Sequence, residues 1–282
     1  MTEKDFPGMP TDNEGRFYYL LDKLVRREGI GDVLANGIHS AAQEIGNGAE
    51  AYAHNNIKKH EQVPIKLGML NPQYFLMFST GEKGNITQIE GQFPQNAFAN
   101  IEDREAFVSD WVQVPDEKFK KYFLDWNPRG ENSFPYYPTP EIASELVDWM
   151  ERMHYIDDSV GVCTGLSAFP LKPPYHINNY PKIISHATGI NFDKDKLWQA
   201  ATRNRILLRA FNVRRGLRRK DERPPEDHWK NRFPELEKKL LDTYYKFKGW
   251  NSDGIPTKET LQELGLDYVV RDFEQRGILQ NE

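Results

Sequence analysis

The sequence predicts a mainly helical, all-α protein, and three observations lead to this fold class. Apolar residues recur with helical spacing along most of the chain, cap residues precede several of these segments, and alternating strand-like patterns are sparse. Hydrophobic residues make up 38% of the 282 residues and charged residues 28%, as in ordinary globular proteins. A chain of this length can form one large domain or two smaller ones around a substantial core.

Two amphipathic helices are expected near the start of the chain. The first covers Glu14–Arg27 and directs an apolar stripe that includes Phe17 and Val25 toward the interior. The second covers Asp32–Gly46, with Asp32 as its N-cap and Gly46 where a helix commonly stops.

Further helices are expected in the second half of the chain. Thr139 followed by Pro140 has the order of a cap and a first turn. The expected segments are 139–153, Asp193–Val213, Pro234–Phe247, Thr257–Leu264 and Val270–Gln275. The only strand candidates are Phe75–Thr80 and Ile86–Ile89, whereas 91–138 is expected to be irregular with two short helices, and the prolines from Pro170 to Pro181 predict a long loop.

Composition excludes several classes of protein. No apolar run approaches the ~20 residues that a membrane span needs. A single cysteine rules out an internal disulfide framework and favours a reducing cytoplasm. The net charge of −5 argues against a dedicated nucleic-acid binder. The seven histidines show no metal-ligand spacing.

The first candidate site is the segment Asp158–Gly165. Its lone Cys163, among small and apolar residues, is by itself typical of a small buried hydrophobe. Gly161 and Gly165, however, allow close backbone approach, and Asp158 offers a fixed acceptor for the N–H groups of a heterocycle. The segment is therefore either a piece of core or a cofactor-binding loop.

The second candidate is a basic cluster that runs through the end of the Asp193–Val213 helix. It comprises Arg203, Arg205, Arg209, Arg214, Arg215, Arg218, Arg219 and Lys220. The cluster is either a solvated helix end that opposes the helix dipole or a phosphate site, because arginine forms bidentate contacts to phosphate. A nucleic-acid surface is disfavoured, since interleaved aromatic residues are lacking.

The third candidate is the glycine-containing segment from Thr80 to Gly91. Such a stretch is either a polar connection or an active-site loop. Glu90 is its best general acid or base.

Several segments, taken together and in order, resemble the aldehyde ferredoxin oxidoreductase family of tungstopterin enzymes. They extend over nearly the whole chain, and the pattern D-x-x-G-L-C is the most specific, with Val162 in place of its leucine. The segments are 29–46, 158–163, 187–189, 209–216, 219–225, 249–257 and 264–266.

The resemblance implies a fold, cofactors and a set of site residues. Residues 1–57 would be the end of the middle helical domain and 58–282 the C-terminal helical domain, with its cofactor-binding loop. Asp158, Gly161 and Val162 would hold one of two pterins that coordinate tungsten, and Cys163 would ligate a [4Fe–4S] cluster. Because a cubane needs about four protein ligands, the other three cysteines would come from a missing N-terminal half or a companion subunit.

The resemblance also implies an oxidoreductase that exchanges electrons with ferredoxin or an electron-transfer subunit. Where the family has a histidine near the metal, this chain has Thr87. That departure, together with a longer stretch before Asp158, makes the chain more similar to the catalytic subunits of class II benzoyl-CoA reductases. We therefore expect a small-molecule substrate, either an aldehyde or an aromatic acyl-CoA, with Glu90 and Thr87 facing it. A helical interaction module without cofactor is the alternative.

Overall fold

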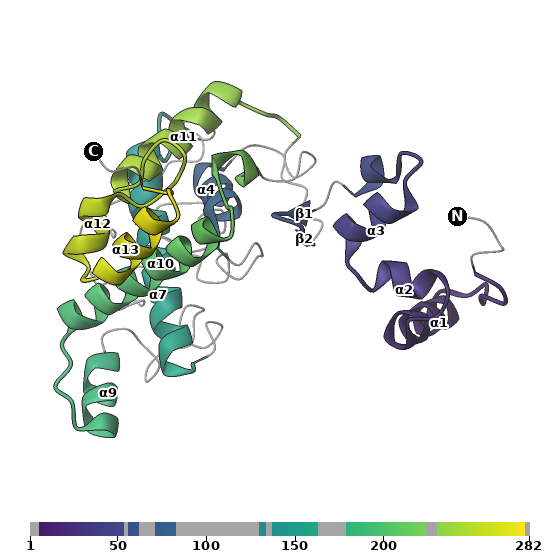
Figure 1. Ribbon diagram of the computed structural model, residues 1–282, viewed down its shortest axis with the longest axis horizontal. Helices are drawn as coiled ribbons and strands as arrows, with labels where there is room; N and C mark the ends of the chain where they lie inside the picture. Colours follow the sequence, from purple (N-terminus) through teal and green to yellow (C-terminus); the bar gives the residue numbers. More distant parts are fainter. Residues whose placement is uncertain are drawn as a thin grey trace.

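The computed structural model describes residues 6–53, 56–61, 71–82, 130–133, 137–162, 179–223 and 230–279. Within these ranges the chain is mainly helical, which confirms the predicted fold class (Figure 1). The elements are α1 (Asn13–Arg26), α2 (Ile30–Leu34), α3 (Ile38–Ile45), η1 (Ala49–Tyr52), β1 (Asn56–Ile57), β2 (His60–Glu61), α4 (Pro72–Thr80), α7 (Pro140–Val160), α9 (Tyr180–Thr188), α10 (Lys194–Arg214), η3 (Arg219–Asp221), α11 (Pro234–Phe247), α12 (Lys258–Glu263) and α13 (Asp267–Gln275).

Most predicted helix starts in the second half of the chain are confirmed, whereas α13 begins at Asp267 and not at the predicted Val270. Thr139 caps α7, where its Oγ1 accepts from the backbone N–H of Ile142 at 3.4 Å. Asp193 caps α10 in the same way through Lys196, at 2.8 Å. Such caps satisfy backbone donors that the first helical turn leaves free. Helix α11 has the bounds that the sequence predicts.

The core lies where α7 packs against α4, α10 and α11. Helix α7 contributes Leu146, Val147, Met150 and Met153 to this core, and all four are buried. Helix α7 continues to Val160, however, beyond the expected end at Met153, so Asp158 lies in the helix and not in a loop after it.

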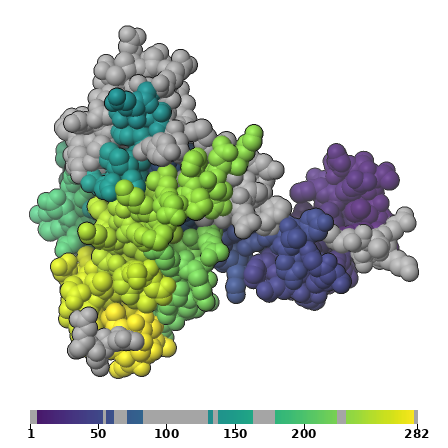
Figure 2. All heavy atoms as spheres, turned by 90° about the horizontal axis from the view of Figure 1, so that it is seen from above, coloured from purple at the N-terminus to yellow at the C-terminus, as the bar shows by residue number. Residues whose placement is uncertain are grey.

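The first three helices are set apart from this helical body in both views (Figures 1 and 2). Helix α1 has no buried residue, and the side chains of Phe17 and Val25 are 62% and 74% exposed. The prediction that its apolar stripe faces the interior is therefore wrong for the residues that the structure describes. The only described helix packed closely against α1 is the short α2. The amphipathic pattern thus specifies a helix but leaves its apolar face uncovered.

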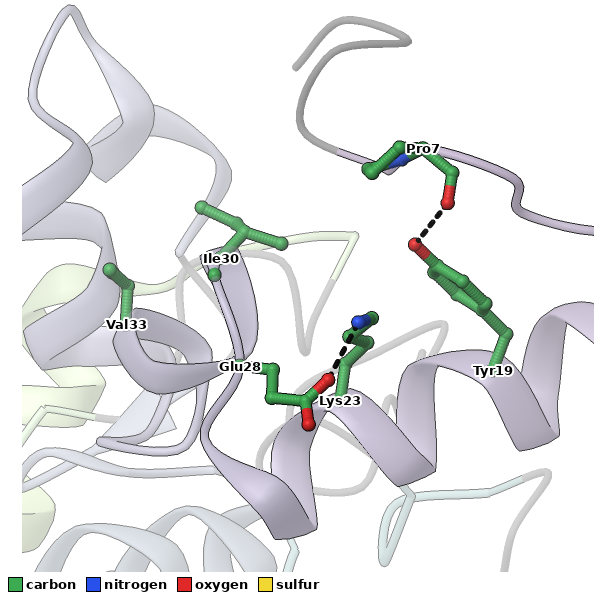
Figure 3. Close-up of a pocket in the computed structure, with 7 residues that line it drawn as sticks. Pro7, Tyr19, Lys23, Glu28, Ile30 and Val33 are labelled. Carbon is green, nitrogen blue, oxygen red and sulfur yellow. Dashed lines mark hydrogen bonds and ion pairs between the residues drawn. The ribbon is translucent and has the colours of Figure 1, made fainter.

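Polar contacts tie helix α1 to the segments on either side of it (Figure 3). The phenol of Tyr19 donates to the carbonyl of Pro7 at 2.9 Å, and Lys23 pairs with Glu28 at 2.8 Å. Together with Ile30 and Val33 these residues line a cleft of about 380 Å³. The first contact holds the segment before α1 against the helix, and the second fixes the turn between α1 and α2, so neither contact buries the helix.

The segment predicted as a single helix over Asp32–Gly46 is two helices. Gly37 separates α2 from α3 with a φ of 86°, a backbone conformation outside the helical region. Asp32 lies inside α2, where it pairs with Arg27 at 2.9 Å, and is not an N-cap. The predicted stop at Gly46 is confirmed.

The strand prediction for Phe75–Thr80 is wrong, because this segment is the helix α4. The side chain of Asn71 accepts from the backbone N–H groups of Gln73 and Tyr74, and Pro72 occupies the first turn. A short buried apolar run is compatible with either a strand or a helix, and the N-cap at Asn71 favours the helix here.

The second strand candidate, Ile86–Ile89, lies outside the described residues, as do most of 91–138 and the start of the proline-rich stretch. Pro181 opens α9 instead of belonging to a loop.

The two described strands form a hairpin that the sequence did not indicate. Asn56 pairs with Glu61 and Ile57 with His60, so the connecting loop is the dipeptide Lys58–Lys59. Both lysines have left-handed φ values, 51° and 70°. A two-residue loop with this geometry prefers Asn-Gly, and a side chain there costs roughly 1–2 kcal/mol per residue. The two lysine side chains therefore strain the backbone of this turn.

Candidate functional site

The last turn of α7 holds the described part of the predicted cofactor site. Asp158 lies in this turn, Gly161 caps the helix and Val162 follows. Cys163, Glu90 and Thr87 lie outside the described residues. The structure thus brings three of the six predicted residues together.

Two neighbouring carboxylates in this turn point in opposite directions. Asp157 is fully buried and accepts a hydrogen bond from the phenol of Tyr180 at 2.7 Å, which joins α7 to α9. The Asp158 side chain is 42% exposed and lies 3.5 Å from Nε2 of the buried His154. Asp157 therefore fixes the helix end, while Asp158 presents a carboxylate at the surface of the described chain.

Gly161 has the conformation that makes a glycine necessary here. Its φ of 74° is left-handed, and its N–H closes the helix on the carbonyl of Asp157. A Cβ added to it would meet no atom of the described residues within 4 Å. The backbone after Asp158 is therefore open to close approach by a ligand.

A buried phenol lies one turn before Asp158. The Oη of Tyr155 has no hydrogen-bond partner among the described residues, and the residue is only 6% exposed. Burial raises the pKa of this phenol far above its usual value, so it stays protonated. Because the phenol oxygen is enclosed, the groups that a heterocycle could reach are the exposed carboxylate of Asp158 and the backbone at Gly161, and these fit the amide and amino edges of a pterin.

A larger buried polar cluster occupies the interior beside this turn. Arg205 and Arg209, both fully buried, extend from α10 into the core. The Nη1 of Arg205 lies 2.7 Å from Glu82 Oε1, and its Nε lies 3.0 Å from Glu151. Arg209 Nη1 lies 3.2 Å from Glu82 and 2.5 Å from Glu222. We call these five residues the ionic core.

The ionic core corrects the interpretation of the basic cluster as a solvated helix end. Arg214 and Arg215 are exposed, but Arg205 and Arg209 are completely enclosed by carboxylates and aromatic rings. The guanidinium of Arg209 stacks on Trp250, 4.2 Å from the ring centroid, and that of Arg205 lies 5.1 Å from the same ring. Arginine tolerates such burial because its planar group is weakly hydrated and pairs with carboxylates.

Electrostatics keep Glu82 ionised despite its burial. Burial by itself raises the pKa of this carboxyl, but the guanidinium groups of Arg209 and Arg205 outweigh it and lower the pKa to about 2. The amide of Asn212 donates to the second carboxylate oxygen at 2.7 Å. Glu82 is therefore an anion shared by two cations, and not a general acid.

A second layer of polar groups surrounds the ionic core. The phenol of Tyr244 lies 2.7 Å from both oxygens of Glu151, and Tyr245 hydrogen-bonds Glu222. Lys248 pairs with Asp148 at 2.6 Å and with Glu151 at 3.2 Å. These contacts join α11 and the residue that follows it to α7 and to the chain just after η3.

Several segments that carry the family resemblance build this cluster. Arg209 donates to the carbonyl of Gly254 at 2.7 Å, and a Cβ on Gly254 would overlap the same guanidinium. Trp250 supplies the stacking ring. The sequence signal that could have revealed the cluster was the recurrence of arginine at positions 205 and 209, on the face of α10 that also buries Ala201 and Val213.

Metal and membrane features are limited in the part of the chain that the structure describes. No group of three or more His, Cys, Asp or Glu side chains in these ranges could hold a metal ion. None of the described helices is long and apolar enough to cross a membrane.

Comparison with solved structures finds a close match over the whole chain. The chain is 67% identical to one in the structure of the active site complex BamBC of benzoyl coenzyme A reductase with 1,5-dienoyl-CoA. The TM-score is 0.94, and the match covers 100% of this chain and 43% of that one.

Curated relatives are more distant and much longer. The tungsten-containing aldehyde ferredoxin oxidoreductase of Pyrococcus horikoshii is 25% identical over 268 residues, which is 89% of this chain and 36% of that protein. The enzyme of the same name from Pyrococcus furiosus is 24% identical over 280 residues, covering 93% and 38%. This chain therefore spans little more than a third of these relatives.

A family model covers nearly the whole chain. The model described as aldehyde ferredoxin oxidoreductase, domains 2 and 3, matches residues 1–266. With the helical fold and the segments that build the ionic core, this match shows that the chain belongs to the aldehyde ferredoxin oxidoreductase family.

Proposed function

We propose that this chain is the C-terminal part of a tungstopterin oxidoreductase that reduces an aromatic acyl-CoA. The observation that carries the proposal is the 67% identity, over the whole chain, to a chain of a benzoyl coenzyme A reductase complex. Identity to the aldehyde-oxidising relatives is only 24–25%. Oxidation of an aldehyde, with ferredoxin as acceptor, is the second candidate because the family takes its name from that reaction.

We assign residues 1–57 to the end of the middle helical domain and 58–282 to the C-terminal helical domain. The separation of α1–α3 from the helical body supports this division (Figure 1). The rest of the enzyme would be a second polypeptide or an N-terminal half, since each relative named above extends well beyond the matched region.

In the assembled enzyme, Asp158, Gly161 and Val162 would hold one pterin. The exposed carboxylate of Asp158 can accept from N–H groups, and the left-handed Gly161 lets the heterocycle approach the backbone. The bound tungstopterin supplies two-electron redox chemistry, and this chain's residues contribute its orientation.

Cys163 would contribute one thiolate to a [4Fe–4S] cluster. As the chain's single cysteine, it needs about three further ligands from the companion polypeptide. The cluster would exchange electrons with ferredoxin or an electron-transfer subunit. Glu90 and Thr87 would face the substrate, and the site of action would be the cytoplasm.

Co-expression with a polypeptide that carries the rest of the family fold tests the proposal. We expect the purified complex to contain tungsten and iron by elemental analysis. With a strong reductant it should convert benzoyl-CoA to a cyclic dienoyl-CoA, by uptake of two electrons and two protons. Turnover of benzaldehyde without turnover of benzoyl-CoA would favour the second candidate, and a complex without tungsten and iron would favour the cofactor-free interaction module.

Variants of the predicted site residues give a sharper test. Asp158→Asn should lower the tungsten and pterin content of the complex, and Cys163→Ser should lower its iron content. The control Glu263→Gln removes an exposed carboxylate on α12 and should change neither. Equal metal content in all three variants would remove Asp158 and Cys163 from the site.

A further inference from the structure

The last turn of α7 holds two adjacent carboxylates at the end of the helix where a negative charge is least favourable. The backbone carbonyl groups at a helix C-terminus already give that end a partial negative charge. Asp157 and Asp158 both lie in this turn, and it contains no basic residue to offset them. Each carboxylate therefore needs a donor from elsewhere to hold it in place.

The two carboxylates have different donors. The phenol of Tyr180 donates to the buried Asp157, and this contact fastens α7 to α9. Asp158 pairs with His154, one turn earlier on α7, whose Nε2 lies 3.5 Å from its Oδ2. The imidazole side chain is 6% exposed and the carboxylate 42%, so this pair joins the buried face of the helix to its surface.

Stability alone does not explain a histidine at position 154. An ion pair with a carboxylate as exposed as that of Asp158 adds little to the free energy of folding. Met150, one turn before His154, shows that the same buried face of α7 accommodates an apolar side chain, which avoids the cost of removing a polar ring from water. The imidazole is therefore better explained by its effect on the carboxylate.

A buried imidazole next to a carboxylate gives that carboxylate a fixed direction. The carboxylate favours the form of the ring in which Nε2 carries a proton, and this N–H then points toward Asp158. The ring is itself held by core packing, and it lies edge-on to Tyr155 with 6.3 Å between the ring centroids. Because a carboxylate has about four lone-pair sites, one such contact leaves it able to accept from the N–H groups of a ligand.

We propose that His154 is a positioning residue for the pterin, and that it acts by fixing the direction of the Asp158 carboxylate. The inference rests on the proposed role of Asp158 as a pterin anchor. A carboxylate held in one orientation binds a heterocycle without first losing its own rotational freedom. Partners that orient a ligating side chain in this way typically raise affinity by about 10–100-fold.

The same turn has a second support that does not involve the carboxylate. Asn204 on α10 donates to the hydroxyl of Ser159 at 3.1 Å. Loss of this hydrogen bond would loosen the helix end but leave the pair of His154 and Asp158 intact. Asn204→Ala is therefore the matched control, because it separates support of the helix from orientation of the carboxylate.

The rate at which the co-expressed complex releases pterin tests the inference, with the fluorescence of the oxidised pterin as the readout. His154→Phe keeps a buried ring but removes the N–H, and it should speed release about tenfold. His154→Gln carries an amide N–H close to the position of Nε2 and should restore most of the retention. Asn204→Ala should release pterin as slowly as the parent complex. Circular dichroism confirms that each variant is folded.

Nitrogen NMR of the full chain by itself gives a second readout that does not depend on a cofactor. We expect the Nε2 resonance of His154 to be that of a protonated nitrogen and to shift in Asp158→Ala, but not in Asn204→Ala. A resonance that is the same in the parent chain and in both variants would overturn the inference.

Equally slow release by His154→Phe and the parent complex would overturn the inference, and so would equally fast release by His154→Phe and Asn204→Ala. If Asp158→Asn loses pterin in that same experiment, Asp158 remains the anchor and only the role of His154 is refuted. Normal pterin retention in Asp158→Asn would instead refute the proposed anchor, and the inference with it.

Discussion

At the scale of single residues, Glu82 shows how a buried charge becomes a structural necessity. Its carboxylate lies against two guanidinium groups that are themselves fully buried. Removing one partner from such a cluster leaves an uncompensated charge in a medium of low dielectric constant. The stability of the helical body therefore depends on the ionisation of this one group.

We expect Glu82→Gln to lower the free energy of unfolding by about 3–5 kcal/mol, because the side chain keeps its shape but no longer neutralises Arg205 and Arg209. Urea denaturation followed by tryptophan fluorescence measures this loss. The matched control is Glu28→Gln, which breaks the exposed pair with Lys23 and should cost less than about 1 kcal/mol. Similar losses in both variants would contradict the structural role of the ionic core.

The depressed pKa of Glu82 also predicts a pH dependence. Its usual value is 4.5, and the folded protein holds it at about 2. The unfolded state therefore binds the proton more readily, so this contribution is complete above pH 4.5 and is lost as the pH falls toward 2. The loss should be roughly 3 kcal/mol, visible in urea midpoints between pH 5 and pH 2. In Glu82→Gln, this part of the acid sensitivity should disappear.

The basic cluster illustrates what sequence can and cannot predict for individual residues. Eight cations near the end of a helix were interpreted as a solvated end or a phosphate site, and two of them instead form buried ion pairs. The spacing of Arg205 and Arg209 on the buried face of α10 is a local signal that they are enclosed. Their partner Glu82 could not be predicted, because it is 123 residues from Arg205 in the chain.

At the scale of elements, caps and proline positions predicted helix starts well. Thr139, Asp193 and Thr257 begin helices as expected. The errors arose where short segments have competing signals. The apolar run in α4 suggested a strand, and the hairpin was missed because its turn contains two lysines in place of Asn-Gly.

That hairpin turn allows a direct test of backbone strain. We expect Lys59→Gly to raise the free energy of unfolding by about 1 kcal/mol, because glycine adopts a φ of 70° without steric cost. Thermal denaturation of the full chain measures the change. The control Lys59→Ala retains a Cβ and should differ little from the parent protein. Destabilisation by glycine would show that the lysine side chain contributes to folding.

At the scale of the whole molecule, the two groups of helices should differ in stability. Helix α1 buries no residue, whereas α7, α10 and α11 surround a continuous core. Local opening requires less free energy where few apolar contacts are lost. Amide hydrogen exchange should therefore be markedly faster in α1–α3 than in α7, and addition of the companion polypeptide should slow it in α1. Equal exchange rates in both groups would contradict this division.

The sequence predicted the family of the chain but not the geometry of the candidate site. Asp158, Gly161 and Val162 lie together because a short motif fixes their spacing, while their role in holding a pterin stays a prediction. Their position at the end of a helix, with Asp157 and Tyr180 fastening that end, depends on packing between α7 and α9. A motif specifies neighbours in the chain, while the direction in which each side chain points is decided by the core.

The Nζ of Lys58 donates to the carbonyl of Gly81 at 2.7 Å and lies 3.5 Å from Glu222, and this attachment has a mechanical consequence. The tip of the hairpin is thus fastened to the helical body, while its second strand is fastened to α3, because the backbone N–H of Ile38 donates to the carboxylate of Glu61 at 2.6 Å. Among the described residues the hairpin therefore acts as a bridge between α3 and the helical body. Replacing the buried ammonium group of Lys58 by an apolar side chain would release the hairpin from the body and leave its bond to α3 in place.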